Sequence, residues 1–532
     1  MSPTTGVHRL AASVTMLGLI AIIAGCGSQP AQSTGGKTLV AETTFAIDSF
    51  DPARAASPTT IMVDHAIYDS LLMINPSDLS KPYPDLATSY SPNAAGTQYT
   101  FQLRHGVKFA NGDPLTSADV VWSLTRDKNV GISGGSPGAA AITMQTLTVT
   151  AAGPYTVIVS SAKPDPAIPV KMTSNNTGVL DSTLVEQHGG TTNGNDKANS
   201  YLNGPSAAGS GPYVLQYVDR TTEVILKANP KYWGPKPTFD TVYVRNAPSA
   251  TQRLDVQDGQ AQLAIDISAV DATALNTADV NVFPAQSDDQ TFLGMNNNPA
   301  VSPLTANPNF REAIKYALDY AGIVKLAGKG SIEATGFVPQ GILGSLPASN
   351  AVQQDLSKAK ADLAMVGVTN PTVTIDYFND FCTDGLCAAP FAEKIQSDLQ
   401  QIGITVKLNG APLATLYPNK IAIGKSQIWL SVANPADYPD PSDFLGFGPG
   451  SYQSLYFDWM TGTDPSADAQ FQAASSAVTP AARASDYQAL GTAINAKAIF
   501  VFIFAAGKAL VTAKSVHAIV NPYWAVDLGL VT

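Results

Sequence analysis

The sequence predicts an α/β protein built from at least two domains, and two observations carry that prediction. The chain has 532 residues, far more than one hydrophobic core normally organises. In its second half, apolar residues follow helical spacing from Phe391 to Ile402, Gly403 ends the pattern, and residues 404–408 then alternate as a strand. Helices that alternate with strands are typical of an α/β architecture.

The first 26 residues carry the three parts of an export signal. Arg9 lies in the short start, an apolar run covers residues 10–22, and the sequence IAG precedes Cys26. This ending resembles the lipobox of bacterial lipoproteins, whose cysteine sulfur receives a diacylglyceryl group. The alternative is a chance cysteine after an ordinary signal peptide. We expect a signal peptide at 1–25, a lipid anchor on Cys26 and a flexible tether at 26–37, which is small and polar.

We expect the mature chain to be acidic and held at the membrane by lipid alone. The chain has 31 basic and 42 acidic side chains. Removal of Arg9 with residues 1–25 leaves 30 and 42, a net charge of −12. This balance, without a basic cluster, argues against nucleic acid or anionic lipid as a partner. After Cys26 no apolar run approaches the ~20 residues that span a bilayer, and IFVFIFAA (499–506) is typical of a buried strand.

The two cysteines beyond Cys26 are expected to form a disulfide. Cys382 and Cys387 are separated by an Asp-Gly turn that could bring their Cα atoms within bridging range. Outside the cytoplasm such a pair is more often a disulfide than a redox or metal site. A loop this short would stabilise the fold by roughly 2 kcal/mol on the chain-entropy estimate.

Local patterns predict several further elements. Residues 99–103 alternate as a half-buried strand, and Thr116 with Asp119 resembles a capping box ahead of a short helix. Residues 131–141 and 188–211 are rich in Gly, Ser and Asn and are expected to be surface insertions.

A helix is expected after Asn309, which can cap it with Glu312 at the third position, and apolar residues follow helical spacing as far as Val324. A domain boundary is expected at residues 286–298, where FLGMNNN follows a charged, turn-like stretch.

Six blocks, in order along the chain, resemble those of one protein family. They are PDLATS (84–89), GTQYTFQLRHGVKFANGDPLTSADVVWSL (96–124), GSGPY (209–213) with NPKYWG (229–234), NFREAIKYALD (309–319), KAKADLAMVG (358–367) and ADYPDP (436–441). The family comprises the extracytoplasmic solute-binding proteins of peptide and nickel ABC transporters, which include the dipeptide- and oligopeptide-binding proteins. The resemblance extends from about residue 38 to the end of the chain.

The resemblance implies a two-lobe, periplasmic-binding-protein-like fold of type II, with α/β lobes and a hinge between them. The first lobe would cover residues 38–288 with an inserted subdomain at about 75–205, and the second lobe would cover 289–507. Residues 508–532 would return to the first lobe. Ligand would bind in the cleft and favour the closed form, which would then meet an ABC permease and its ATPase subunits. We expect a monomer on the outer face of the bacterial cell membrane.

Ligand contacts are expected from loops at the cleft rather than from the six scaffold blocks. These contacts are Thr44, Phe45, Asn296, Asn434, Ala436, Asp437 and Tyr438. The resemblance places Asp437 where dipeptide binders carry the carboxylate that pairs with a peptide's α-amino group. An ammonium taken from water needs such a charge-assisted partner. The alternative is a turn former, because Asp437 lies beside the dipeptide Asp440-Pro441.

The chain departs from the dipeptide-binding pattern in one region. Dipeptide binders resembling this chain place an arginine for the peptide carboxylate before the Phe391 helix, whereas residues 376–390 contain no Lys or Arg. Longer peptides, held by backbone hydrogen bonds, therefore fit better than a free dipeptide. A non-peptide solute such as an oligosaccharide, or a regulatory lipoprotein that carries no cargo, stays open as an alternative.

The sequence predicts no enzyme, metal site or cofactor. Residues 134–138 match the G-x-S-x-G nucleophile elbow, but Pro137 has no N–H to donate to an oxyanion. The histidines of the mature chain are far apart and without ligand spacing, namely His65, His105, His188 and His517. No P-loop is present, so ATP hydrolysis would belong to a partner subunit.

Overall fold

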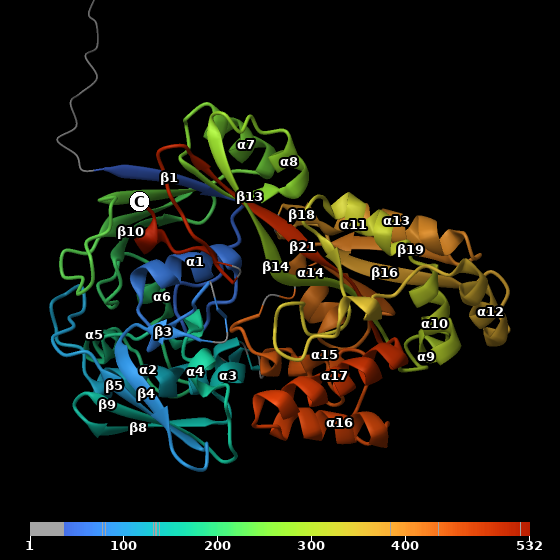
Figure 1. Ribbon diagram of the computed structural model, residues 1–532, viewed down its shortest axis with the longest axis horizontal. Coiled ribbons are helices and arrows are strands. Elements are labelled where there is room, and N and C mark those ends of the chain that lie inside the picture. The colour runs from blue at the N-terminus through green and yellow to red at the C-terminus, as the bar shows by residue number, and fades with distance from the viewer. Residues whose placement is uncertain are drawn as a thin grey trace, which may run out of the picture. The chain divides into compact units, whose positions relative to one another are not determined.

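One mixed sheet of 11 strands runs through most of the described chain. The structure is a computed structural model that describes residues 37–532 apart from Ser77, Ser80, Gly131, Gly134, Gly135, Gly138, Asp384, Ala433, Pro435 and Pro522. In spatial order the strands are β10 (Tyr213–Asp219), β11 (Glu223–Ala228), β12 (Thr241–Asn246), β1 (Thr38–Thr43), β13 (Leu263–Ser268), β21 (Phe500–Ala513), β14 (Val280–Met295), β20 (Ile428–Ser431), β16 (Thr372–Phe378) and β19 (Thr405–Ala411) (Figure 1). The short strand β15 (Ile332–Glu333) pairs with β21.

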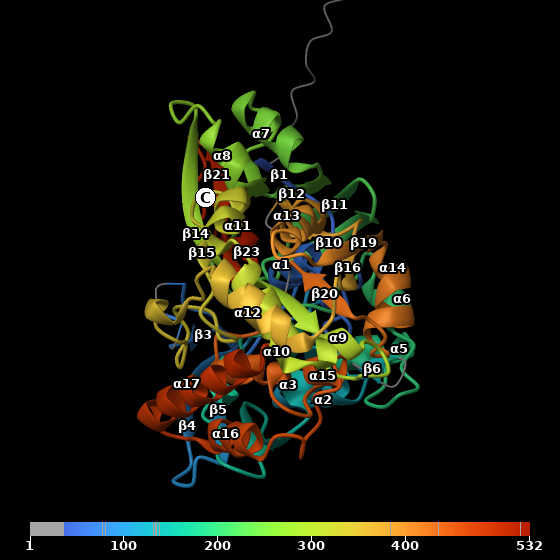
Figure 2. The same ribbon diagram turned by 90° about the vertical axis from the view of Figure 1, so that its right-hand side faces the viewer.

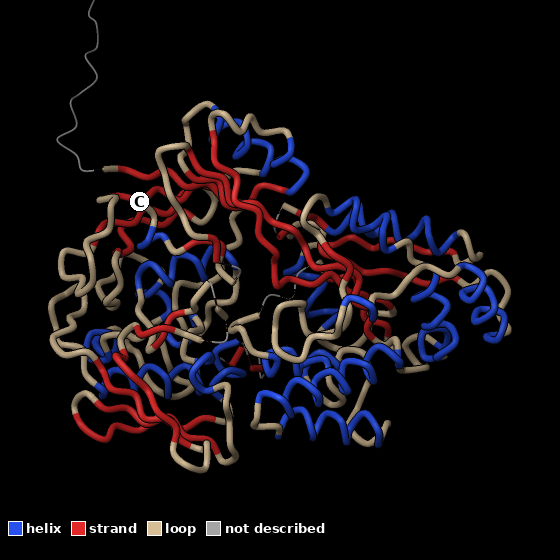
Figure 3. The backbone as a smooth tube through the Cα atoms, viewed as in Figure 1, coloured by secondary structure: helices blue, strands red, loops and turns tan. Residues whose placement is uncertain are grey.

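Two long strands, β14 and β21, connect the N-terminal part of this sheet (β10 to β13) with its C-terminal part (β20, β16 and β19). They pair antiparallel, with a register break between Gln286 and Gln290. Strand β21 continues the sheet through β13, and β14 continues it through β20. Figure 3 shows both strands running from one part of the sheet to the other. The register break lies at the start of the predicted boundary region 286–298, and the lobe limits themselves stay a prediction.

Two separate apolar cores pack against the two parts of the sheet. The core on the N-terminal part includes Leu39, Val224, Leu226, Val242, Val244, Leu510, Val526 and Leu528. The core on the C-terminal part includes Leu293, Phe310, Ile314, Val373, Ile375, Phe391, Ile395, Val501 and Ile503. Residues 500–506 of β21 are buried, which confirms the strand predicted from IFVFIFAA. The first half of β21 thus packs in the core of the C-terminal part, whereas Leu510 packs in the core of the N-terminal part.

The helices of the C-terminal part cover its strands and extend beyond them. Helix α13 (Ala388–Gln400) buries Phe391, Ile395 and Leu399, as the helical spacing predicts, and Gly403 follows with a φ of +87° before β19. Figure 2 shows α16 and α17 side by side. The other helices are α9 (Pro303–Ala306), α10 (Pro308–Ala317), α11 (Tyr320–Ala327), α12 (Leu356–Val366), α14 (Leu413–Leu416), α15 (Tyr452–Leu455), α16 (Pro465–Ser476) and α17 (Pro480–Lys497).

The helix predicted from Asn309 onward is wrong in its start and in its length. The cap is Asn307, whose side chain accepts the Asn309 backbone N–H at 2.9 Å. The chain leaves the helix at Leu318, and Asp319 starts α11 by accepting the Gly322 N–H at 2.9 Å. Apolar spacing alone did not reveal this break, because the apolar pattern continues through it.

The N-terminal part carries a smaller antiparallel sheet. It consists of β4 (Ala87–Pro92), β5 (Gln98–Leu103), β9 (Thr156–Ser161) and β8 (Leu147–Gly153). Strand β5 and the capped helix α2 (Ser117–Val130) confirm two predicted elements, since the Thr116 N–H bonds the Asp119 carboxylate at 2.9 Å. The remaining helices are α1 (Pro58–Ile67), α3 (Ala139–Met144), α4 (Ile168–Lys171), α5 (Ser182–Gln187), α6 (Asn199–Leu202), α7 (Ser249–Gln257) and α8 (Ala269–Thr273).

Residues 188–211 are mostly exposed or half-buried, in line with the surface segment that their composition predicts. One side chain of this segment reaches the interior. Asp196 accepts a hydrogen bond from Arg126 Nε at 2.8 Å, and Arg126 also pairs with Asp51 at 2.6 Å. Arg126 and Asp51 are fully buried. Because a buried ion pair needs every partner, Asp196 ties this surface segment to the interior. A Gly- and Asn-rich composition does not reveal this distant partner.

Short elements complete the described chain. Hairpins of two-residue strands are β2 (Leu72–Met73) with β3 (Tyr83–Pro84), β6 (Ile132–Ser133) with β7 (Ser136–Pro137), β17 (Cys382–Thr383) with β18 (Leu386–Cys387), and β22 (Val520–Asn521) with β23 (Ala525–Val526). Short 3-10 turns cover Asn175–Thr177, Ala348–Asn350, Pro441–Phe447 and Leu528–Leu530, and Tyr417–Ile421 forms a π-helical turn. Within residues 37–532 as described, every helix is too short or too polar to cross a bilayer. Cys26 and the three glycines of the 134–138 motif lie outside the described residues.

Candidate functional site

A cavity of about 60 Å³ lies where the N-terminal part, the C-terminal part and the two long strands meet. Its walls come from the loop after β1, from α1, β13 and β14, from the hairpin β17–β18, from β21 and from the C-terminal segment. The lining includes Thr44, Ala46, Asp266, Asp288, Asp289, Cys382, Thr383, Lys508, Tyr523 and Trp524. Of the predicted contacts, Thr44 is in this wall.

Two neighbouring carboxylates on β14 hold the loop at 434–438 against the cavity. Asp288 and Asp289 are 7% and 6% exposed, and they lie inside the register break of β14. The Ala436 N–H donates to Asp288 at 3.0 Å, and the Asn434 N–H donates to Asp289 at 2.9 Å. The predicted contacts Asn434 and Ala436 therefore reach the site through their backbone. Their position depends on residues that the sequence analysis did not single out.

Asp437 lies in a cluster of carboxylates. Its N–H donates to Asp443 Oδ2 at 2.8 Å, and Asp288 is close enough to act on both carboxyl groups. Asp437 lies deep among protein atoms, although part of its side chain still reaches water. This burial, together with Asp288, raises the pKa of Asp437 to about 7. Burial and the neighbouring Asp437 raise the pKa of Asp443 well above its usual range.

Within the part of the chain that the structure describes, Asp437 and Asp443 differ from their neighbour Asp440 in having no basic partner. Asp440 has a counter-ion, because both of its oxygens accept hydrogen bonds from Arg483, one of them at 2.9 Å. Among the described residues, no Lys or Arg side chain forms an ion pair with Asp437 or Asp443. A cation supplied from outside would therefore offset the cost of bringing these carboxylates together.

Three of the predicted contacts have other partners in the structure. Asn296 is fully buried, and its amide donates to the carbonyls of Gly424 and Ser426 at 3.0 Å. Tyr438 is 3% exposed and packs with Ala167 and Val170. Phe45 packs against the N-terminal core. None of these three side chains lines the cavity, and their role as ligand contacts stays a prediction.

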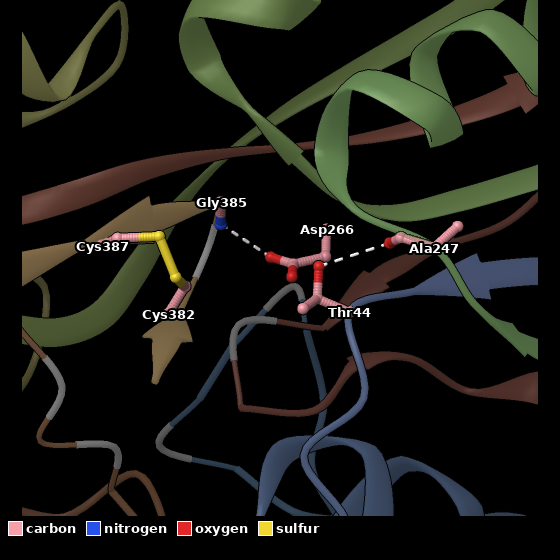
Figure 4. The surroundings of a disulfide bond; sticks show 6 residues. All are labelled: Thr44, Ala247, Asp266, Cys382, Gly385 and Cys387. Carbon is pink, nitrogen blue, oxygen red and sulfur yellow. Dashed lines mark hydrogen bonds between the residues drawn. A yellow bond between two sulfur atoms is a disulfide. The ribbon is translucent and has the colours of Figure 1, made fainter. Parts of the chain in front are cut away.

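A disulfide joins Cys382 and Cys387, whose Cα atoms are 4.3 Å apart across the hairpin β17–β18 (Figure 4). The hairpin crosses to the N-terminal part of the sheet, since the Gly385 N–H donates to Asp266 Oδ1 at 2.7 Å. The Thr383 hydroxyl donates to Asp289 at 2.9 Å. The disulfide thus fixes a short hairpin that closes one side of the cavity.

Replacing Gly385 with Ala tests this contact. Gly385 has a φ of +71°, and a Cβ there would lie 2.6 Å from Ser268 N on β13, so the hairpin would have to move. Gly367 has the same φ of +71° with nothing within 4 Å of its Cβ position, which makes Gly367→Ala the matched control. We expect the control to lower the free energy of unfolding by about 1 kcal/mol and Gly385→Ala to lower it by about 2–3 kcal/mol. Equal losses in chemical denaturation would show that the hairpin does not press on β13.

Asp266, Lys508 and the pair Tyr523–Trp524 line the cavity and were not predicted. The consecutive acids Asp288 and Asp289 were a visible signal, because they belong to the stretch that the sequence marks as charged and turn-like. No local signal marked the others, since they reach the cavity through pairing between strands that are more than 200 residues apart.

In the part of the chain that the structure describes, no group of three or more His, Cys, Asp or Glu side chains is arranged so that it could hold a metal ion.

Comparisons with known proteins connect this chain to one family of binding proteins. Residues 81–454 match the family model for bacterial extracellular solute-binding proteins, family 5, middle region. The chain is 27% identical over 430 residues to the probable D,D-dipeptide-binding periplasmic protein DdpA of Escherichia coli K12. The aligned region covers 75% of this chain and 79% of that protein.

Solved structures agree with that match. The dipeptide-binding protein of Pseudoalteromonas sp. SM9913 in complex with Met-Leu has a TM-score of 0.80 at 20% identity, over 93% of this chain and 99% of that chain. DppA of Helicobacter pylori in complex with the peptide STSA has a TM-score of 0.77 at 21% identity, over 93% of this chain and 97% of that chain. At such identities the likeness shows the fold, which is the two-lobe fold of type II periplasmic binding proteins.

Proposed function

The chain belongs to family 5 of the bacterial extracellular solute-binding proteins, and from this membership we propose that it is the peptide-capturing subunit of an ABC importer. It binds its cargo in the cavity between the lobes and delivers it to a membrane permease. ATP hydrolysis belongs to the importer's own ATPase subunits. The chain itself has no catalytic role.

The carboxylate cluster of Asp437, Asp443 and Asp288 is the observation that carries this proposal. A peptide with a free N-terminus brings an ammonium group, which supplies the missing positive charge through charge-assisted hydrogen bonds. Asp437 is the anchor, because it combines partial exposure with a backbone position fixed by Asp443. Asp288 belongs both to this cluster and to the cavity wall, so the two features form one site.

Peptides longer than two residues fit the chain better than free dipeptides. A dipeptide offers both of its charges within a few ångströms, and its carboxylate needs a cation close to the ammonium site. Residues 376–390 contain no Lys or Arg, and Lys508 in the cavity wall already has an interaction within the protein. A longer peptide places its carboxylate away from the carboxylate cluster and is held by backbone hydrogen bonds.

Closure of the two lobes is the mechanism we propose for capture. Strands β14 and β21 are the crossings between lobes, and the break at Gln286–Gln290 is the point where their pairing is interrupted. Ligand contacts on both sides stabilise the closed arrangement. The Gly385–Asp266 hydrogen bond belongs to that arrangement.

Native mass spectrometry with a defined equimolar mixture of tripeptides tests the function. We expect the protein to retain peptide masses, to gain melting temperature by mass action and to lose radius of gyration in solution scattering. Retention of an oligosaccharide or another non-peptide solute from its own host, with no peptide bound from the mixture, would contradict the peptide proposal. Binding without a change in scattering would contradict closure.

We also propose that Cys26 anchors the protein by lipid to the outer face of the bacterial cell membrane. Several acyl chains on one cysteine would anchor stably, whereas one chain binds weakly. Cys26→Ala is expected to block lipidation and cleavage, so that the precursor keeps residues 1–25. Intact-mass measurement of the wild-type protein checks this, and any mature N-terminus other than a lipidated Cys26 contradicts it.

A further inference from the structure

Two aromatic residues near the C-terminus, Tyr523 and Trp524, line the cavity, and each has a buried side-chain polar atom without a hydrogen-bond partner. They follow β22 in the turn before β23, and their side chains are 9% and 4% exposed. The unpaired atoms are the Tyr523 hydroxyl oxygen and the Trp524 indole Nε1. Buried donors are nearly always paired in folded proteins, because an unpaired donor costs stability. Two such donors in one cavity wall therefore need an explanation.

The surrounding packing holds both rings in place. Trp524 stacks on His65 with ring centroids 3.6 Å apart and planes at 24°. The backbone N–H of Tyr523 donates to Asn521 Oδ1 at 2.9 Å. Both rings also belong to an apolar cluster that includes Ile61 from α1 and Phe292 from β14. The two donors are thus presented by a rigid wall and cannot easily turn to find partners elsewhere.

The donors lie next to the carboxylate cluster. Burial, together with Asp288, Asp443 and Asp440, raises the pKa of the Tyr523 hydroxyl well above its usual range, so this group stays a neutral donor. An anionic ligand group would be repelled here by the same carboxylates. A neutral carbonyl oxygen accepts hydrogen bonds without that repulsion. The chemistry of the wall is therefore complementary to an ammonium group followed by a carbonyl.

We propose that Tyr523 and Trp524 donate hydrogen bonds to the first carbonyl oxygen of the cargo, next to the ammonium group held by Asp437. The inference rests on the proposed function and narrows it to solutes that begin with a free aminoacyl group. Such a wall discriminates an N-terminal peptide end from a simple amine, which has the ammonium but no carbonyl. It also gives the C-terminal segment a direct part in cargo recognition.

Tyr523→Phe and Trp524→Phe remove each donor and keep an aromatic ring. We expect each variant to bind the tripeptide that the wild type retains most strongly about tenfold more weakly, the value of one hydrogen bond in a desolvated site. Tyr523→Phe should at the same time raise the melting temperature of the peptide-free protein, because it removes an unpaired buried hydroxyl. If the Tyr523 hydroxyl only stabilises the fold, Tyr523→Phe should instead lower the melting temperature of the peptide-free protein.

Trp429→Phe is the matched control. Trp429 Nε1 is also buried without a partner, but Trp429 packs among Phe292, Phe378 and Phe457 and is not in the cavity wall. We expect this variant to bind the same tripeptide as the wild type does.

A tripeptide with sulfur in place of the first carbonyl oxygen completes the test, because sulfur is the weaker acceptor. The wild type should discriminate against it and both donor variants should discriminate less. Equal discrimination in all three proteins overturns the inference while peptide capture, and with it the proposed function, stands. If the wild type retains no tripeptide at all, the proposed function fails and the inference falls with it.

Discussion

Asp437→Asn is expected to weaken peptide binding by roughly thirty- to several-thousand-fold. The substitution keeps the shape of the side chain and removes its charge, so the peptide ammonium loses its counter-ion in the carboxylate cluster beside the cavity. Leaving one member of a buried charge pair alone costs on the order of 2–5 kcal/mol. Calorimetry with the tripeptide that the wild type retains most strongly measures the loss.

A control separates this effect from a change in net charge. Asp258 is exposed after α7, outside the cavity wall, and Asp258→Asn removes the same charge. We expect near wild-type affinity for this variant. If Asp437 is only a turn former, both variants will bind the peptide equally well. That result would favour a non-peptide solute as the natural cargo.

Peptide affinity is expected to depend on pH with a maximum between about 7 and 8. The pKa of Asp437 is raised to about 7, so the carboxyl group is largely protonated below that pH. A peptide ammonium binds the ionised form, and binding therefore releases a proton. Affinity should fall about tenfold per pH unit from 7 to 5. Above about 8 it should fall again, because the peptide α-amino group itself loses its proton.

The stability of the peptide-free protein should change in the opposite direction over the acidic range. Between the ordinary pKa of an aspartate, 3.8, and about 7, the folded protein holds a proton on Asp437 that the unfolded chain has lost. The free energy of unfolding from this group is therefore highest at low pH and decreases as pH rises to 7. Denaturation at pH 5 and 7 and calorimetry at the same values check both signs.

Neighbouring groups set the size of these pH effects. Asp288 and Asp443 act on Asp437, and Tyr523 lies near Asp288 and Asp443, while Asp440 is neutralised by Arg483. The protons belong to the cluster as a unit. Asp437→Asn should remove most of the fall in peptide affinity between pH 7 and pH 5, and Asp443 should account for the rest. If affinity falls as steeply in Asp437→Asn as in the wild type, another group takes up the proton.

Much of the scaffold follows from local patterns in the sequence. The alternation at residues 99–103, the capping pair Thr116 and Asp119 and the apolar face of α13 each depend on neighbours within one element. Other features leave no trace in such local patterns. The ion pair of Asp196 with Arg126 joins residues 70 positions apart, and the break at Leu318 is not visible in an apolar pattern that continues across it.

The candidate site was predictable only in part, for the same reason. Asp437 was found from the resemblance of residues 436–441, and Thr44 was expected as part of a loop at the cleft. Thr44 lines the cavity, and Asp437 belongs to the carboxylate cluster. Asn296 has the polar side chain that a ligand contact needs, but its amide is taken up by backbone carbonyls of a loop more than 100 residues away. Tyr523 and Trp524 come to the cavity because β21 returns the chain to the N-terminal part of the sheet.

A double-mutant cycle by calorimetry tests the central claim most directly. It compares the wild type and Asp437→Asn, each with the retained tripeptide and with its N-acetylated form. If the peptide ammonium sits on the carboxylate of Asp437, acetylation weakens wild-type binding severely and adds little in the variant, because both changes break one pair. The predicted coupling energy is then on the order of 2–5 kcal/mol. A coupling energy near zero, with acetylation acting equally on both proteins, would contradict the account.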